Sequence, residues 1–160
     1  KEIHEQPKAI RDTMTGRVSL NEKINLGDFK LTKEELDNID RIYIIACGTA
    51  YNAGLIGKVA IEDLARIPVE VAIASEFRYR NPIVTNKTLI VTLSQSGETA
   101  DTLAVLRDAK KIGAKTLAVT NVVGSSISRE ASSSLFDKNA FFIAQYAKTG
   151  RFLHPVSQIT

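Results

Sequence analysis

The sequence predicts one α/β domain, built as a parallel sheet of four to five strands with helices on both faces. The first observation behind this prediction is the alternation of short apolar segments with longer helical segments along the chain. The second is that the apolar segments are rich in β-branched residues and nearly continuous, as expected of strands that are buried on both sides. Strand, crossover helix and strand in succession form right-handed βαβ units, and such units build a parallel sheet.

Two helices are expected before the first strand, in an N-terminal segment, 1–40, that we expect to pack on the domain. Residues 8–14 continue a helix from Pro7, because proline is tolerated in the first turn of a helix. Thr32 and Glu35 have the spacing of a capping box, which predicts the start of a second, short helix.

Four strands and three crossover helices follow. The strands are predicted at RIYIIA (41–46), VEVAIA (69–74), TLIVTL (88–93) and KTLAVT (115–120). The helices are predicted from Gly48 to about Arg66, over SEFRYR (75–80), and from Glu98 to Ile112. Gly113 ends the last of these helices, because glycine adopts the left-handed conformation that closes many helices.

The composition excludes several classes of function. A chain of 160 residues has the size of one domain. The net charge is only +3, tryptophan is absent and aromatic residues make up 6%, so we expect no nucleic-acid partner. The apolar runs are far shorter than a bilayer span, so we expect no membrane partner. The single cysteine, Cys47, excludes an internal disulfide and a cysteine-built zinc site, and we expect a cytoplasmic protein without metal or cofactor.

Two loops with small polar residues follow the first and the third strand. They read CGTAYNAG (47–54) and SQSGET (94–99), and each turns through a glycine into a helix. In a parallel sheet both loops lie at the carboxyl ends of the strands, where ligands bind. A helix N-terminus offers free backbone N–H groups and about half a positive charge, which suits a phosphate. Neutral hydrogen-bond donors gather at the second loop, namely Ser94, Gln95, Ser96 and Thr99.

Nucleotide-binding motifs are absent from both loops. Neither loop has the Gly-Lys-Ser/Thr ending of a P-loop, and neither has the G-x-G-x-x-G pattern of a dinucleotide site. The sequence therefore favours a small phosphorylated molecule over a nucleotide.

The same residues also have purely structural interpretations. In this interpretation the whole role of Ser96 is to cap the following helix, since serine is a favoured N-cap residue. Glu98 is expected to be a first-turn acid rather than a catalyst, with its carboxylate pointing away from a bound phosphate. Cys47 is expected to pack as a small hydrophobe at the end of its strand. Asn121 and Ser125 are expected to cap the next short helix.

Four segments, in their order and spacing, resemble the isomerase (SIS) domains of the glutamine–fructose-6-phosphate aminotransferase family. These segments are CGTAYNAG (47–54), ARIPVEVAIASEFRYR (65–80), SQSGETADT (94–102) and NVVGSS (121–126). The resemblance implies the N-terminal SIS half of the family's isomerase module, with a flavodoxin-like three-layer sandwich. On this basis we assign residues 41–131 to the SIS domain and residues 132–160 to a C-terminal tail that departs from the family's sequence.

The resemblance also implies a site. The loop at 94–99 wraps the phosphate of fructose 6-phosphate or glucosamine 6-phosphate in the family. The residues to which this role carries over are Ser94, Gln95, Ser96 and Thr99. Thr49 matches a threonine that contacts the sugar, whereas Ala50 replaces a family serine, so one donor on the phosphate side is missing.

The groups that the family uses for catalysis lie in parts that this sequence does not match. The family's general base and Schiff-base lysine belong to its second SIS half, and its ammonia comes from a glutaminase domain. We therefore assign no catalytic residue and expect this chain to bind a sugar phosphate without converting it. The family also implies a homodimer, because its isomerase modules dimerise.

Two other functions are compatible with the same residues. One is a stand-alone SIS module that senses a sugar phosphate for a regulator. The other is a dimerisation fragment whose site is vestigial, because Ala50 and the altered tail remove ligand contacts.

Overall fold

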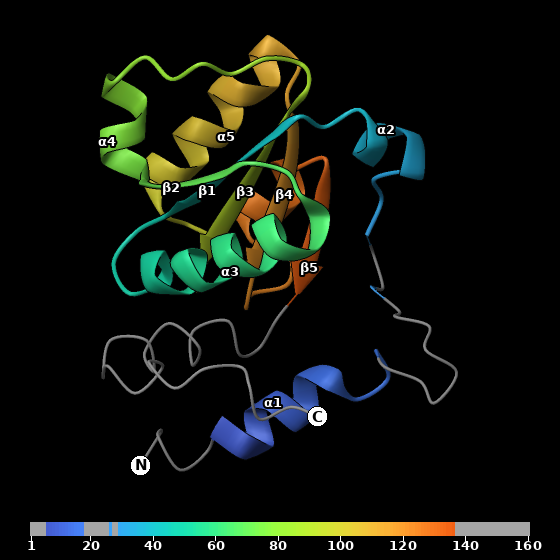
Figure 1. The fold of residues 1–160 in the computed structure, drawn as a ribbon. Helices are drawn as coiled ribbons and strands as arrows, with labels where there is room; N and C mark the ends of the chain where they lie inside the picture. The colour runs from blue at the N-terminus through green and yellow to red at the C-terminus, as the bar shows by residue number, and fades with distance from the viewer. Residues whose placement is uncertain (1–5, 18–25, 27–28, 137–160) are drawn as a thin grey trace.

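The computed structural model describes residues 6–17, 26 and 29–136. Within these ranges, parallel strands form one sheet in the order β2-β1-β3-β4-β5 (Figure 1). The strands are β1 (Arg41–Ala46), β2 (Val69–Ile73), β3 (Thr88–Ser94), β4 (Lys115–Thr120) and β5 (Ser133–Phe136). The fold class predicted from the sequence is thus confirmed, and the strand order is that of flavodoxin-like sheets.

Helices lie on both faces of the sheet and make a three-layer structure (Figure 1). The helices are α1 (Gln6–Met14), α2 (Lys33–Asp37), α3 (Ala50–Ala65), α4 (Ala74–Tyr79), α5 (Ala100–Ile112) and α6 (Ser126–Glu130). Helix α3 packs on β1 and β2 from one side, whereas α4, α5 and α6 pack from the other side.

Each face of the sheet has its own apolar core, because successive side chains of a strand point to opposite sides. On one face Tyr43 and Ile90 contact Phe77 of α4 and Val105 of α5. The rings of Tyr43 and Phe77 meet edge to face, with their centroids 4.9 Å apart. On the opposite face the buried residues come from the strands and from the N-terminal segment, and they are Leu31, Ile39, Ile42, Ile44, Val69, Leu89 and Val91.

The structure differs from the prediction at several element boundaries, by one or two residues each, and in one additional strand. The second strand ends at Ile73, because Ala74 is already the first residue of α4. The helix expected from Glu98 begins at Ala100. The sheet gains β5, which lies within the segment 132–160 where no strand was expected. The predicted left-handed stop at Gly113 is confirmed, with a φ of 91°.

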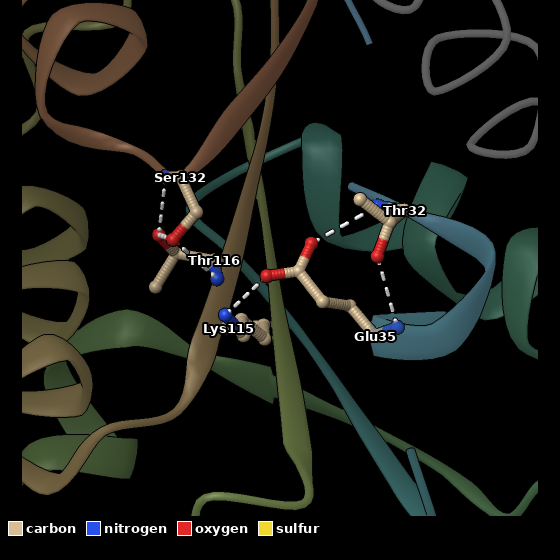
Figure 2. A network of polar contacts seen from close by, with 5 residues as sticks. All are labelled: Thr32, Glu35, Lys115, Thr116 and Ser132. Atoms are coloured by element: carbon tan, nitrogen blue, oxygen red, sulfur yellow. Dashed lines mark hydrogen bonds and ion pairs between the residues drawn. The ribbon is translucent and has the colours of Figure 1, made fainter. Parts of the chain in front are cut away.

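The N-terminal segment is fastened to the amino end of the sheet by polar contacts (Figure 2). The predicted capping box of α2 is confirmed, since Thr32 N donates to Glu35 Oε2 at 3.0 Å and Glu35 N donates to Thr32 Oγ1 at 3.2 Å. The second carboxylate oxygen of Glu35 pairs with Lys115 Nζ at 2.5 Å, and this contact holds the pKa of Glu35 below its ordinary value.

The fifth strand is joined to the fourth in the same region. Ser132 N donates to Thr116 Oγ1 at 2.8 Å, and Thr116 N donates to Ser132 Oγ at 3.3 Å (Figure 2). Lys30 N donates to Ser133 Oγ at 2.8 Å, which links β5 to the segment before α2.

In the ranges that the model describes, no helix combines the length and the apolar character needed to cross a bilayer.

The packing of α3 on the sheet depends on a glycine. A Cβ built at Gly54 would lie 2.8 Å from Val71 Cγ1 and 3.0 Å from Ile44 Cγ2, so the helix approaches β1 and β2 through a bare backbone. Gly57, one turn later, has room for a methyl group, because its nearest neighbour is Ile44 Cδ1 at 3.5 Å.

We predict that Gly54→Ala and Gly57→Ala change the free energy of unfolding in different ways. Both substitutions gain the same helix propensity, about 1 kcal/mol. Only Gly54→Ala also overpacks the interface with β1 and β2, which typically costs about 1–3 kcal/mol. Chemical denaturation should therefore rank Gly57→Ala as the more stable variant. Equal stabilities would contradict the close approach at Gly54.

Candidate functional site

The strand order places a crevice at the carboxyl ends of β1 and β3. From β1 the chain crosses through α3 to β2 on one side, and from β3 it crosses through α5 to β4 on the other side. The two neighbouring strands β1 and β3 therefore send their following loops in opposite directions. Ligands of open α/β sheets bind at such switch points.

A pocket of about 200 Å³ occupies this crevice. Its lining residues are Cys47, Thr49, Ala50, Leu93, Ser94, Gln95, Ser96 and Thr99. All five residues that the sequence analysis selected for ligand binding are among them, so the two loops do meet at one place. Leu93 is a lining residue that the sequence analysis did not select, because it reads only as part of the strand.

Two serine hydroxyls organise the loop 94–99. Ser94 Oγ accepts a hydrogen bond from Gly97 N at 3.0 Å, and Ser96 Oγ accepts one from Glu98 N at 3.2 Å. A hydroxyl that accepts a backbone N–H still has its own proton to donate. Ser94 is buried while Ser96 is exposed, so the two donors lie at different depths of the pocket. Thr99 Oγ1 lies 3.4 Å from Ser94 Oγ and adds a third hydroxyl.

The loop requires glycine at position 97. Gly97 has a φ of 68°, which is in the left-handed region that L residues rarely adopt. A Cβ at this position would also lie 2.1 Å from Ser125 Oγ and 2.9 Å from Thr120 Oγ1. The loop is thus pressed directly onto the segment that connects β4 to α6.

Glu98 does not have the role expected of it as a first-turn acid. It precedes α5, which begins at Ala100, and its Oε1 accepts a hydrogen bond from Ser126 N of α6 at 2.8 Å. Hydrogen bonds from Ser126 hold the pKa of the Glu98 carboxyl below its ordinary value, and the nearby charge of Arg129 acts in the same direction. The carboxylate is directed at α6 and does not line the pocket, which confirms the expected orientation.

The expected helix caps are also corrected, and Asn121 is not at the start of α6, because the N-cap position of that helix is Ser125. Ser96 bonds the N–H of Glu98, which precedes α5, so its side chain closes a turn rather than capping the helix. Ser125 occupies the N-cap position of α6 but makes no side-chain cap hydrogen bond, and its hydroxyl donates to Ser128 Oγ at 3.2 Å. The Glu98 carboxylate bonds the first amide of α6 instead.

The wall of the pocket formed by β1 and α3 is less polar. Cys47 is half-buried, packs against the core and lies with its Sγ 3.7 Å from Thr102 Oγ1, as expected of a small residue at the strand end. Thr49 is the N-cap residue of α3 and its side chain makes no cap hydrogen bond. Ala50, the first residue of α3, presents only a methyl group to the pocket.

None of the charged side chains in the described part of the chain lines the pocket. Among the described residues no group of three or more histidine, cysteine or acidic side chains is placed to hold a metal ion. The two histidines of the chain, His4 and His154, lie outside the described residues.

Comparison with known proteins gives a consistent family. The model of the SIS domain family matches residues 35–140. The glutamine–fructose-6-phosphate aminotransferase of Clostridium perfringens is 68% identical over 136 residues, which are 85% of this chain and 22% of that protein. The enzyme of the same name from Corynebacterium diphtheriae is 51% identical over 160 residues, which are the whole chain and 25% of that protein.

Solved structures give the same picture. The C-terminal domain of glucosamine-fructose-6-phosphate aminotransferase from Francisella tularensis superimposes with a TM-score of 0.79 at 40% identity, covering 91% of this chain and 43% of that chain. A glucosamine-6-phosphate deaminase from Thermotoga maritima shares the fold, with a TM-score of 0.65 at 21% identity over 94% of this chain and half of its own. The chain spans about a quarter of the length of the curated relatives it matches.

Proposed function

Because the chain belongs to the SIS domain family, we propose that it is the sugar-phosphate-binding half of the isomerase module of a glutamine–fructose-6-phosphate aminotransferase. Its ligand in this proposal is fructose 6-phosphate or glucosamine 6-phosphate, and its place is in hexosamine biosynthesis. The observation that carries the proposal is the pocket at the carboxyl ends of β1 and β3, where both predicted loops meet.

The chemistry of the pocket suits a phosphate. Three hydroxyls, those of Ser94, Ser96 and Thr99, stand at the start of α5, and the amide of Gln95 adds a further donor. Helix α5 begins at Ala100 and α3 begins at Ala50, so the positive ends of two helix dipoles face the same crevice. Phosphates bind readily at helix N-termini, where backbone N–H groups and the dipole both favour negative charge. Thr49 lines the opposite wall, and in this proposal its hydroxyl contacts the sugar.

The two other functions considered from the sequence receive less support. The two curated relatives reported above are aminotransferases rather than regulators. A vestigial site also fits poorly with a pocket that brings all five selected residues together.

The central test is Ser96→Ala, which we predict weakens binding of glucosamine 6-phosphate by about tenfold to a hundredfold. A hydrogen bond to a charged group contributes roughly 1.5–3 kcal/mol, which corresponds to that loss. Isothermal titration calorimetry measures the affinity, and circular dichroism checks that the fold is intact. Ser75→Ala, in the first turn of α4 and away from the pocket, is the matched control and should bind as the wild type does. Equal affinity of Ser96→Ala and wild type would refute the assignment.

A change that adds a donor, Ala50→Ser, is predicted to tighten binding by up to about tenfold. It places a hydroxyl at the first residue of α3, in the wall of the pocket proposed to hold the phosphate. The same calorimetric titration applies. An unchanged affinity would show that position 50 does not reach the ligand.

We also predict that the chain forms a homodimer through α3. This helix exposes the large apolar side chains of Leu55 and Val59, which are 41% and 68% accessible and, at four positions apart, lie on the same face of the helix. Contiguous exposed apolar surface marks interaction sites. Sedimentation analysis should give a dimer for the wild type and a monomer for Val59→Lys, while Ile83→Lys, equally exposed on a different surface, should remain dimeric. A monomeric wild type at high concentration would contradict this prediction.

Finally, we predict that the purified chain binds but does not convert its ligand. Moving a proton between the first two carbons of a sugar phosphate requires a base beside them. Among the described residues, the side chains that line the pocket are hydroxyls, an amide, a thiol and apolar groups, and the carboxylate of Glu98 is bonded to α6. A coupled assay for interconversion of glucosamine 6-phosphate and fructose 6-phosphate should show only the buffer rate. Turnover above the buffer rate that is lost in Glu98→Gln would show that Glu98 is a catalytic base and would refute this prediction.

A further inference from the structure

The loop 94–99 is held against the residue that follows β4 and against the first turn of α6 by three hydrogen bonds. Asn121 N donates to Gln95 O at 3.3 Å, and Ile127 N donates to Gly97 O at 3.0 Å. These two bonds join backbone to backbone. The third joins Ser126 N to the Glu98 carboxylate at 2.8 Å, and it is the shortest of the three.

The bond made by Glu98 differs from the other two because it involves a charged side chain. Hydrogen bonds with an ionised partner are roughly twice as strong as neutral ones. The carboxylate also lies where α6 begins, and it accepts from an amide that has no carbonyl partner within that helix. Arg129 reinforces the arrangement, since its guanidinium donates to Ser126 Oγ at 3.1 Å and to Gly124 O.

We propose that Glu98 is a positioning residue, whose carboxylate clamps the loop 94–99 onto α6 and thereby fixes the hydroxyls of Ser94 and Ser96 for the phosphate. The inference rests on the proposed function, because it assigns a role within the same site. The clamp acts through the backbone: Glu98 N is bonded to Ser96 Oγ, and Gly97 N is bonded to Ser94 Oγ. Holding the side chain of Glu98 to α6 therefore holds the two amides that orient the serines.

The positioning role and simple charge repulsion predict opposite changes in ligand affinity when the carboxylate is removed. A carboxylate that merely lies near a bound phosphate repels it, so its removal would tighten binding. A carboxylate that positions the loop makes binding weaker when it is removed. Truncation to alanine therefore separates the two roles by the direction of the change.

The first experiment titrates the chain with glucosamine 6-phosphate by calorimetry. We expect Glu98→Ala to bind about tenfold more weakly than the wild type, which corresponds to the loss of one charged hydrogen bond. Glu98→Gln keeps an oxygen that accepts from Ser126 N, so it should retain affinity within about threefold of the wild type. Asp101→Asn is the matched control, since it also removes a carboxylate near the loop. The carboxylate of Asp101 pairs with Arg78 at 3.2 Å and not with α6. Its affinity should equal that of the wild type or exceed it slightly.

The second experiment needs no ligand. Amide hydrogen exchange measured by NMR should be about tenfold faster at Ser126 in Glu98→Ala, and also faster at Gly97 and Glu98, while the core amides of β1 remain unchanged. Unchanged exchange at these positions, or binding in Glu98→Ala that is as tight as in the wild type, would overturn the positioning role. A wild type that shows no affinity for any sugar phosphate would refute the proposed function, whereas the exchange measurement would still decide whether Glu98 holds the loop.

Discussion

The candidate site depends on the contact between Gly97 and the segment that precedes α6. A side chain at position 97 would overlap Ser125, whose Oγ lies 2.1 Å from the place of a Cβ, and the backbone there adopts a φ of 68°. Only glycine meets both conditions at low cost. Because the loop can approach so closely, Gly97 O reaches Ile127 N and the carboxylate of Glu98 reaches Ser126 N. The geometry of the donors that face the pocket follows from this approach.

The register of the sheet explains why the two loops meet at all. Ala46, the last residue of β1, lies opposite Leu93 of β3, and Leu93 lies opposite Val119 of β4. In a parallel sheet such a register brings the loops that follow neighbouring strands together at the carboxyl ends of those strands. Here these are the loops after β1, β3 and β4. The first two line the pocket, and the third holds the second in place. The amino ends of the strands have a different role. There the Glu35–Lys115 pair fastens the N-terminal segment, and the Thr116–Ser132 bonds fasten β5 (Figure 2).

Most of the architecture is predictable from the sequence, because the strand at 41–46 is a nearly continuous apolar run and the strand at 115–120 alternates buried with half-buried residues. The pocket is predictable for the same reason, since parallel strands bring polar loops to a shared edge. β5 is not, because SSLF is short and its place at the edge of the sheet depends on pairing with β4. The role of Glu98 is not predictable either. Its partner, Ser126, is 28 positions away, and sequence favours the local interpretation as a helix-start acid.

The size of the pocket bears on what one SIS domain can do by itself. Pockets that enclose small ligands typically measure about 300–1,000 Å³, whereas this one measures about 200 Å³. Such a volume suits a phosphate and its nearest carbons better than a whole hexose phosphate. The remaining atoms of a sugar would then extend beyond the pocket walls that β1 and β3 provide. That geometry agrees with the proposed role as one half of a site, because the half that recognises the phosphate needs donors and helix ends, while the chemistry occurs at carbons that lie further out.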